Sequence, residues 1–398
     1  MSLKWLFLDM NSFFASVEQQ ENPALRGRPI AVAPVMSDTT CCIAASYEAK
    51  AFGIKTGTNI GEAKRLCPHL IIVEARHSPY RQYSEAVVAA VETCTPVHQV
   101  WSVDEMVCKL WRNDYHPDNA RKLALHIKQT IAKEVGECLR CSIGISLNPF
   151  LAKVCSELEK PNGLVIMDDS DMPHALYVLN LRDFPGINRG MEARFNSAGV
   201  FSVEQMYALT KEQMKQVFGG VGGEHWWRSL RHEDVVNAPT GRSSFSNSHI
   251  LAPEFRSAEG ATHIAGKLLE KCAERMRYRG FCAKGLSVYM RSTSGETWSR
   301  KTRFTPCQDT FTLLGLMRAL WEHPFSTPKQ VGLALYDVIP AANTTMTLFP
   351  EDERRLQAAR AVDQINQRFG RTTLSMASVF LHKKEAPDRI AFNHVSEM

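Results

Sequence analysis

Apolar runs of strand length alternate with helical patterns between residue 4 and about residue 168. This alternation favours helices layered on a sheet, and the segments resemble βαβ units. The strand-like runs are WLFLD, PIAVAP, LIIVEA, HQVWSV, MVCKLW, CSIGIS and GLVIM. The helical patterns extend from Ser12 to Gln20, Tyr83 to Cys94, Pro117 to Val135 and Pro149 to Glu159. We expect an α/β architecture here, with Cys41 and Cys42 packed in a further apolar strand.

Two short acidic segments follow such runs. FLDMNSFFASVE carries Asp9, and WSVDEM carries Asp104 and Glu105 at the end of the run from Val97 to Val103. Neighbouring strand ends can bring three carboxylates together, and such a cluster repels itself unless cations neutralise it. Carboxylate oxygens suit Mg²⁺, which proteins often hold together with substrate phosphates. The two segments predict metal-assisted phosphoryl transfer, and a helix N-cap at Asp9, shared with Ser12, is the simpler alternative.

The composition indicates an intracellular protein of several domains. The chain has 398 residues, of which 44% are hydrophobic and 22% charged, enough for about two to four domains. No run of about 18 apolar residues could span a bilayer, and the N-terminus lacks a signal-peptide pattern. The eleven cysteines are odd in number and scattered, as free thiols would be. Cys138 and Cys141 form a CxxC without a second Cys/His pair, so we expect no zinc site there.

The net charge of +5 is concentrated late in the chain. Between Phe245 and Pro340 there are 13 Lys and Arg residues against 8 Asp and Glu residues. This regional excess fits a surface that follows a phosphate backbone, and a solvated basic face is the alternative. The patterns in this region indicate a helix from Ala258 to Arg279, a strand at GLSVYMRS, a charged hairpin arm at TWSRKTRF, a helix near Phe311 to Trp321 and a strand at VGLALYDV.

Short helices punctuated by glycine follow Asp168. LRDFPGINRGMEARFNSAGV indicates a helix, a Pro-Gly hairpin and a second helix, whose backbone N–H groups can hold a phosphate. An ordinary αα turn is the alternative. VVNAPTGRSSFSNS at 235–248 indicates a linker. After residue 341, TTMTLFPED precedes an amphipathic helix that Gly370 ends and whose apolar positions are Leu356, Ala359, Val362, Ile365 and Phe369.

Four motifs together carry a family resemblance. FLDMNSFFASVE, SYEAKAFGI, SVDE and SIGISLNPFLAKVCSELEKPNGLVI occur in the order and spacing of Y-family, translesion DNA polymerases of the bacterial type, which the chain resembles from about residue 4 to residue 340. The resemblance implies an α/β and α+β multidomain fold like a right hand, with a ferredoxin-like palm, small fingers, a helical thumb with a helix-hairpin-helix and a little finger domain. The palm would be 1–11 and 78–168, the fingers 12–77, the thumb 169–238, the linker 239–248, the little finger 249–340 and the tail 341–398.

The resemblance also implies a two-metal site. Asp9, Asp104 and Glu105 would be the catalytic residues and, with the Met10 carbonyl, would hold two Mg²⁺ ions, for which Mn²⁺ can substitute. One ion would lower the pKa of the primer 3′-hydroxyl, and the other would orient the triphosphate and stabilise the leaving pyrophosphate.

Nucleotide contacts are implied as well. Phe14 would be the steric gate against a ribose 2′-hydroxyl, beside Phe13. Tyr47, Lys50 and Lys160 would contact the triphosphate, although Lys50 replaces the family's usual Arg and loses its bidentate geometry. GTN at 57–59 departs from the usual Gly-x-Pro.

DNA and partner contacts complete the expectation. Primer-template DNA would meet Gly186 and Gly190 of the thumb and the little-finger residues Arg291, Arg300, Lys301 and Arg303. TMTLF at 345–349 resembles the sliding-clamp peptide of some relatives, with Met346, Leu348 and Phe349 as anchors and Thr345 where Gln is preferred; a small satellite core is the alternative. Deoxynucleoside triphosphates would be substrates, and the protein would act as a cytoplasmic, bacterial monomer without membrane contact.

The function implied is template-directed, error-prone translesion synthesis with low processivity and no proofreading, as in the SOS response and mutagenesis. Small fingers would enclose the nascent pair loosely, so geometric discrimination would be weak. The competing hypothesis is a catalytically inactive member that acts as a DNA- and clamp-binding adaptor. A nucleotide cyclase with a related palm would leave the thumb and little finger unexplained.

Overall fold

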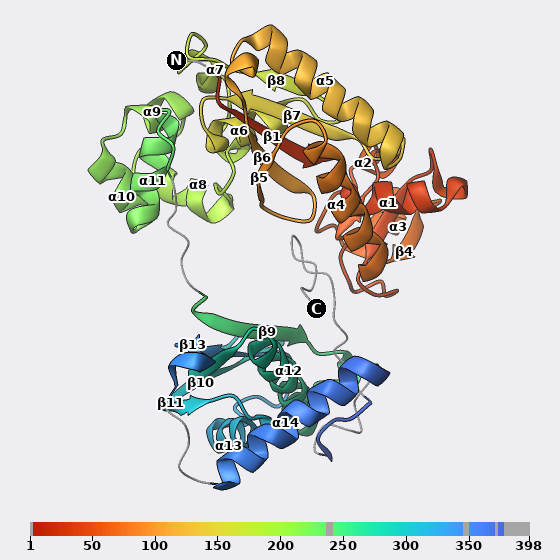
Figure 1. The fold of residues 1–398 in the computed structure, drawn as a ribbon, viewed down its shortest axis with the longest axis vertical. Coiled ribbons are helices and arrows are strands. Elements are labelled where there is room, and N and C mark those ends of the chain that lie inside the picture. The colour runs from red at the N-terminus through yellow and green to blue at the C-terminus, as the bar shows by residue number, and fades with distance from the viewer. Residues whose placement is uncertain (1–2, 236–241, 345–349, 371–372, 378–398) are drawn as a thin grey trace. The chain divides into compact units, whose positions relative to one another are not determined.

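The computed structural model describes residues 3–235, 242–344, 350–370 and 373–377 (Figure 1). These residues divide into an N-terminal unit, which ends at 235, and a C-terminal unit, which begins at 242. Each unit has its own hydrophobic core.

A five-stranded sheet with the order β5-β6-β1-β7-β8 organises the N-terminal unit. The strands are β1 (Trp5–Met10), β5 (Val97–Val100), β6 (Glu105–Lys109), β7 (Cys141–Ser146) and β8 (Leu164–Ile166). β7 and β8 are parallel, and the other neighbouring pairs are antiparallel. The expectation of successive βαβ units is therefore wrong for most of this sheet, because a short hairpin joins β5 to β6 where a parallel pair would need a crossover.

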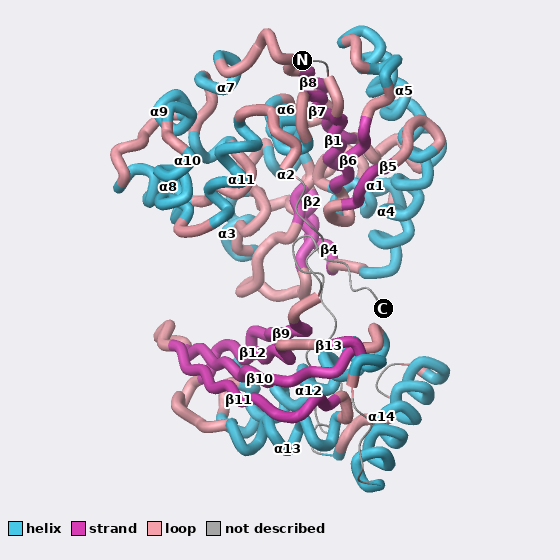
Figure 2. Tube along the Cα trace, turned by 60° about the vertical axis from the view of Figure 1, so that its left-hand side comes forward, coloured by secondary structure: helices cyan, strands magenta, loops and turns pink. Residues whose placement is uncertain are grey.

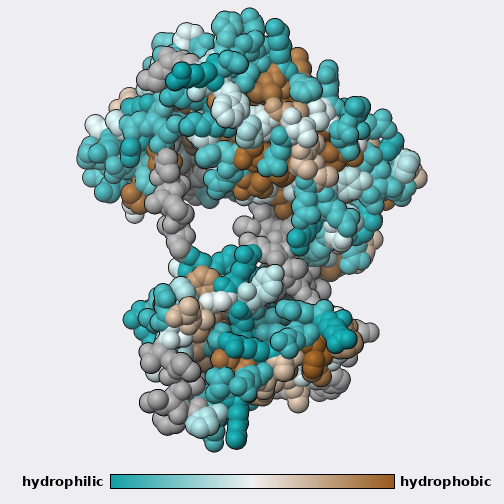
Figure 3. Space-filling view, in the orientation of Figure 1, coloured by the Kyte–Doolittle hydropathy of each residue, from teal (hydrophilic) through white to brown (hydrophobic). Residues whose placement is uncertain are grey.

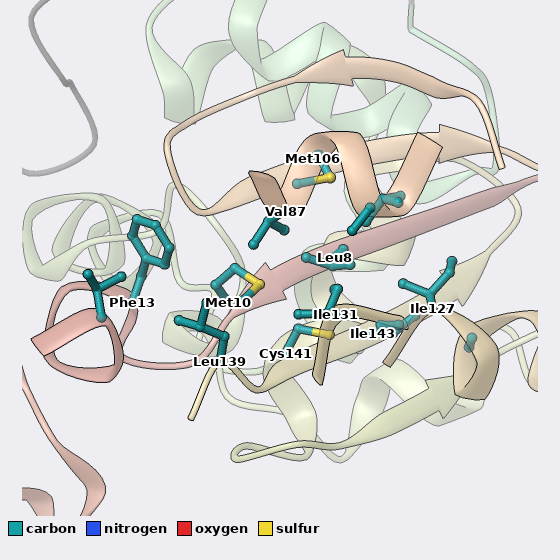
Figure 4. Close-up of a cluster of buried hydrophobic side chains, with 14 of the residues drawn as sticks. Leu8, Met10, Phe13, Val87, Met106, Ile127, Ile131, Leu139, Cys141 and Ile143 are labelled. Atoms are coloured by element: carbon teal, nitrogen blue, oxygen red, sulfur yellow. The ribbon is translucent and has the colours of Figure 1, made fainter. Parts of the chain in front are cut away.

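Helices cover both faces of this sheet. Helices α4 (His77–Glu92) and α5 (Pro117–Glu134) pack on one face, and α6 (Pro149–Leu158) packs on the other. Side chains alternate along β1. Leu8 and Met10 join the core beneath α4 and α5 (Figure 4), whereas Phe7 packs with Ala152 of α6. Asp9, two residues after Phe7, therefore faces α6.

The helix ends follow local chemistry. α4 begins at His77, earlier than the predicted Tyr83, because Pro79 falls in its first turn, where no N–H is needed. Helix α1 (Phe13–Glu21) lies one residue from its predicted bounds, and α5 and α6 each end one residue before theirs. Phe13 and Phe14 of α1 are buried in the core that the sheet shares with α4 and α5.

The part of the chain that follows α1 and precedes α4 forms a smaller sheet. It contains β3 (Ala44–Ala45), β2 (Ile30–Ala33) and β4 (Ile71–Glu74), joined by helices α2 (Tyr47–Lys50) and α3 (Ile60–Leu66). The strand expected at Cys41 and Cys42 is wrong, since Cys41 is exposed and forms only an isolated bridge with Asn59, but Cys42 is buried in the core of this sheet as expected. The Asn59 side chain accepts hydrogen bonds from the first N–H groups of α3, so an N-cap stands where the family's usual proline would be.

The remainder of the N-terminal unit is helical. Its helices are α7 (His174–Tyr177), α8 (Arg189–Ser197), α9 (Val203–Ala208), α10 (Lys211–Phe218) and α11 (Val221–Leu230). The segment before the Pro-Gly hairpin, which was predicted to be a helix, is a single 3₁₀ turn at Leu181–Asp183. Gly186 has a φ of +92°, a left-handed conformation that glycine adopts without steric cost.

The C-terminal unit is a five-stranded antiparallel sheet with helices on one face (Figure 2). In the order β11-β10-β12-β9 four strands are Thr297–Cys307, Phe281–Ser292, Pro328–Tyr336 and Ser244–Ile250, and the short β13 (Ile339–Pro340) pairs antiparallel with the start of β10. Helices α12 (Ala258–Tyr278) and α13 (Thr310–Leu320) form close to their predicted bounds and cover the sheet. The predicted linker is wrong from Ser244 onward, because this segment pairs with β12.

The predicted amphipathic helix of the tail is α14 (Pro350–Phe369), and Gly370 follows it with a φ of +104°. Asp363 of α14 forms an ion pair with Arg277 of α12, with Nε and Oδ2 2.6 Å apart. Further 3₁₀ turns lie at Pro23–Leu25, Arg112–Asp114, Pro253–Phe255 and Ala341–Asn343.

The visible surface is mostly hydrophilic, with hydrophobic side chains in separate groups (Figure 3). Among the described residues, none of the helices combines the length and the apolar character that crossing a bilayer requires.

Candidate active site

Asp9 of β1 lies directly opposite Glu105, the first residue of β6. Residues that are opposite each other in an antiparallel pair share a face, so both carboxylates lie on the face covered by α6. Asp104 belongs to the preceding hairpin, and its carbonyl accepts a hydrogen bond from the Met10 N–H at 2.9 Å. The expectation that the run ending at Val103 delivers these carboxylates from a strand end is therefore wrong, because β5 ends at Val100 and Glu105 opens the next strand.

A third carboxylate beside this pair is one that the sequence analysis missed. Asp9, Glu105 and Glu157 each have an oxygen within 4.8 Å of the other two. Glu157 lies on α6, and Lys153, Glu157 and Lys160 follow one another at intervals of four and three residues. This spacing places Lys153 and Glu157 on one side of α6, with Lys160 just after the end of the helix, and it was the available sequence signal.

Two lysines neutralise part of this negative charge. Lys153 Nζ lies 2.5 Å from Glu105 Oε1. Lys160 Nζ lies 2.9 Å from Asp9 Oδ1 and 2.8 Å from Glu157 Oε1. With Asp104 the site has four carboxylates and two lysines that pair with them. An excess of negative charge therefore remains, which added cations would neutralise.

Burial makes the remaining charge costly. Burial raises the pKa of Asp9 to about 8. The ammonium of Lys160 opposes this rise, and the negative charges of Glu157 and Asp104 add to it. Burial also raises the pKa of Asp104, against the hydrogen bond that Ser102 Oγ donates to Oδ1 at 2.5 Å. Although burial alone disfavours its ammonium, Asp9 and Glu157 raise the pKa of Lys160. The carboxylates therefore favour either a proton or a cation.

Unpaired polar atoms lie beside the carboxylates. The Tyr47 hydroxyl and Ser12 Oγ are buried near each other, and neither forms a hydrogen bond of good geometry within the described part of the chain. Ser12 has a φ of 48°, a left-handed conformation that costs a non-glycine residue about 1 kcal/mol or more, and it starts α1 without capping it. Lys50 Nζ lies 4.1 Å from the centroid of the Tyr47 ring. Buried polar atoms without partners indicate a place where a polar ligand binds.

Lys128 of α5, which the sequence analysis also missed, holds the loop that carries Lys160. Its Nζ donates to the carbonyls of Cys141, Asn162 and Gly163 at 2.9, 2.7 and 2.8 Å. The Asn162 N–H in turn donates to Asn11 Oδ1 at 2.6 Å. The loop after α6 is thus tied to both α5 and the end of β1. No local pattern in the sequence identifies a lysine of this kind.

A glycine permits α6 to approach the sheet closely. A Cβ atom on Gly144 of β7 would lie 2.0 Å from the Ala152 carbonyl and 2.4 Å from the Ser156 nitrogen, both in α6. Because such contacts are impossible, the SIGIS strand requires glycine here, and the charged side of α6 depends on it.

The basic residues predicted to contact DNA lie on β10 and β11 of the C-terminal unit. The register places Lys301 opposite Ser287, on the face away from the helices, and Arg300 opposite the buried Val288. Arg291 and Arg303 lie on the Lys301 face by the same alternation. Arg300 pairs with Glu322 at 3.2 Å, and Arg303 pairs with Asp337 at 2.5 Å.

The glycines predicted to contact DNA lie in the N-terminal unit. Gly186 is in the hairpin, and Gly190 is in the first turn of α8. The predicted clamp residues Met346, Leu348 and Phe349 lie outside the described residues.

Known proteins resemble this chain along most of its length. The model of the impB/mucB/samB family matches residues 8–157, and the model of its C-terminal domain matches residues 242–348. DNA polymerase IV of Moorella thermoacetica is 30% identical over 388 residues, which covers 94% of this chain and 95% of that protein. DNA polymerase IV of Staphylococcus aureus is 27% identical, over 86% of this chain and 98% of that protein.

Solved structures share the fold. A Y-family DNA polymerase chimera of Dbh and Dpo4 has a TM-score of 0.71 at 21% identity, covering 85% of this chain and 99% of that one. An insertion ternary complex of Dbh DNA polymerase has a TM-score of 0.57 at 20% identity, with the same coverage. The matched motifs, the relatives along nearly the whole chain and the shared fold lead to one conclusion: the chain belongs to the impB/mucB/samB family, the Y-family DNA polymerases.

Proposed function

We propose that this protein is a template-directed DNA polymerase that carries out error-prone translesion synthesis. One observation carries the proposal: Asp9 and Glu105 lie opposite each other on neighbouring strands, beside Asp104, in a chain that belongs to this family. The adaptor alternative gains no support, since all three carboxylates are retained and the relatives are named polymerases. We expect low processivity and no proofreading.

The donor set fits divalent cations. Oxygens of Asp9, Glu105 and Glu157 lie within 4.8 Å of one another, and hard carboxylate oxygens are ligands for Mg²⁺ or Mn²⁺. Asp9, Asp104 and Glu105, with the Met10 carbonyl, would hold two ions. When bound, these ions would lower the pKa of the primer 3′-hydroxyl and stabilise the leaving pyrophosphate.

The residues around the carboxylates would bind the nucleotide. Tyr47 offers a buried hydroxyl that has no partner among the described residues, and Lys50 and Lys160 offer ammonium groups for the triphosphate. Lys160 would then exchange a carboxylate for a phosphate oxygen. Phe14, buried in the first turn of α1, would exclude a ribose 2′-hydroxyl, with Phe13 beside it.

Primer-template DNA would be held by backbone groups near Gly186 and Gly190 and by the face of the C-terminal unit that carries Arg291, Lys301 and Arg303. Residues 1–11 and 78–168 would form the palm, 12–77 the fingers, 169–238 the thumb and the C-terminal sheet the little finger. The protein would act as a monomer in the cytoplasm.

A primer-extension assay tests the proposed activity. The wild type should extend a primer on undamaged and lesion-bearing templates with Mg²⁺, and Asp104→Ala combined with Glu105→Ala should abolish extension. Asp118→Ala combined with Glu134→Ala, which removes two exposed carboxylates of α5, is the control and should keep full activity. DNA binding by the wild type without extension, even with Mn²⁺ and a sliding clamp, would refute the proposal.

Clamp binding is a separate part of this proposal. Residues 345–349 resemble a clamp-binding peptide, with Met346, Leu348 and Phe349 as its anchors. Deletion of 346–349 should abolish stimulation of extension by the clamp and leave extension without the clamp unchanged. Stimulation that survives the deletion would assign these residues to the fold instead.

A further inference from the structure

Glu105 has an ion-pair partner that the metal site does not require. Lys153 Nζ lies 2.5 Å from Glu105 Oε1, and the two side chains are only 17% and 16% exposed. The ammonium also lies 5.0 Å from the centroid of the Phe7 ring and 5.6 Å from that of Trp101. These two rings pack edge to face at 5.1 Å. The Lys153 ammonium is therefore enclosed by one carboxylate and two aromatic rings.

The position of Lys153 is set by the sheet beneath α6. The preceding residue, Ala152, is buried against Phe7, and its carbonyl lies over Gly144. This close seating limits the movement of α6 on the sheet, so Lys153 Nζ has a defined place beside β6. Lys160 differs, because it follows the end of α6 and divides its contacts between Asp9 and Glu157.

We propose that Lys153 is a positioning residue for Glu105. By holding Oε1 it fixes the rotamer of the carboxylate and leaves the second oxygen for a divalent cation, so it sets the cation affinity of the site. Partners that orient a metal ligand usually change metal affinity or activity by about 10- to 100-fold when they are removed. The inference rests on the proposed function in taking Glu105 as a metal ligand.

The same geometry also allows the opposite effect on cation affinity, so the direction of the change on removing Lys153 decides between the two roles. If Lys153 were only a counter-charge that the cation displaces, its removal would tighten cation binding, because a competitor would be lost. If Lys153 orients Glu105, its removal weakens cation binding, because the carboxylate must then be ordered by the ion itself.

The experiment measures Mn²⁺ binding to the full chain by the loss of the free-ion EPR signal. The sample contains primer-template DNA that ends in a dideoxynucleotide and the matching deoxynucleoside triphosphate, so no turnover occurs. Lys153→Met should weaken Mn²⁺ binding by about 10- to 100-fold, and Lys153→Arg should restore most of the affinity. Lys109→Met is the matched control and should bind Mn²⁺ like the wild type, because Lys109 lies 5.5 Å over the Trp5 ring at the far end of β6.

Unchanged or tighter Mn²⁺ binding by Lys153→Met would overturn the inference. Thermal unfolding without metal checks folding, and Lys153→Gln replaces the Met variant if that variant is unstable, with the same expected direction. A purely structural role would lower kcat through the folded fraction, whereas positioning raises the Mg²⁺ concentration needed for half-maximal extension. Wild-type chain that binds Mn²⁺ but extends no primer would refute the proposed function and leave the binding comparison interpretable.

Discussion

The Tyr80 ring stacks on the Phe14 ring, with centroids 4.5 Å apart and 29° between the planes. Tyr80 is fully buried, and its hydroxyl donates to Glu18 Oε1 at 2.6 Å. Arg76 donates to both oxygens of the same carboxylate, at 3.1 and 2.6 Å. The side chain assigned as the sugar gate is thus supported from behind by α4, so its ring cannot swing away freely.

Phe14→Ala should raise ribonucleotide incorporation relative to deoxynucleotide incorporation by about 10- to 200-fold, the range that one apolar pocket contact usually controls. Single-nucleotide insertion with matched triphosphates measures the ratio of kcat/KM. Val17→Ala, which also removes a buried apolar side chain from α1, is the control for lost packing and should leave sugar selectivity unchanged. Unchanged selectivity in Phe14→Ala would remove the gate assignment.

Without metal, the stability of the chain should fall as the pH rises toward 9. Burial raises the pKa of Asp9 from 3.8 in the unfolded chain to about 8, so the folded state favours the protonated form. The contribution of Asp9 to the free energy of unfolding is complete below about pH 4 and is lost as the pH rises through about 8. Asp9→Asn should therefore unfold at a higher temperature than the wild type at pH 8 to 9 in EDTA, by about 2–4 °C for each kcal/mol relieved.

Thermal unfolding between pH 5 and pH 9 checks this, with Asp118→Asn, an exposed α5 residue, as the control. Added Mg²⁺ should stabilise the wild type more than Asp9→Asn, because the cation replaces the proton. Equal melting temperatures of Asp9→Asn and the wild type across the pH range would contradict the cost assigned to Asp9.

Lys301→Glu should weaken primer-template binding and lower the slope of log affinity against log salt by about 1, because one phosphate contact releases about one counterion. Arg300→Glu should have a smaller effect, since Arg300 points to the helix-covered face and already pairs with Glu322. Fluorescence anisotropy at several salt concentrations measures both. If the two variants lost the same affinity for primer-template DNA, the face of β11 on which a charge lies would not decide its contact with DNA.

Lys128→Met should raise the KM for deoxynucleoside triphosphates several-fold and destabilise the N-terminal unit by about 1.5–3 kcal/mol, the cost of losing a charged hydrogen-bond donor. The reason is that Lys128 holds the loop that carries Lys160. Steady-state kinetics and urea unfolding measure the two effects. Lys133→Met on the same helix, an exposed lysine, should change neither. A stability loss with an unchanged KM would separate the loop from nucleotide binding.

Much of the fold was predictable because its signals are local. The apolar run of β1, the period of α12 and the Pro-Gly hairpin each report on a single segment. The prediction failed where pairing between segments decides the outcome. The segment from Ser244 to Ile250 has a polar, linker-like composition, yet it is a strand, because β12 offers it an unpaired edge. The two alanines of β3 likewise form a strand only because β2 lies beside them.

By itself the sequence determined the family and much of the order of the elements, and it predicted Asp9, Asp104 and Glu105 as a cluster of carboxylates, because the motifs that carry them are short and contiguous. The tertiary structure alone decided which charges meet. Glu157 joins the carboxylates, Lys153 holds Glu105 and Lys128 holds the loop of Lys160 because strand register and the seating of α6 on Gly144 bring distant segments together. The period of a single segment contains no information about its partner in space, so these contacts could not be predicted from the sequence.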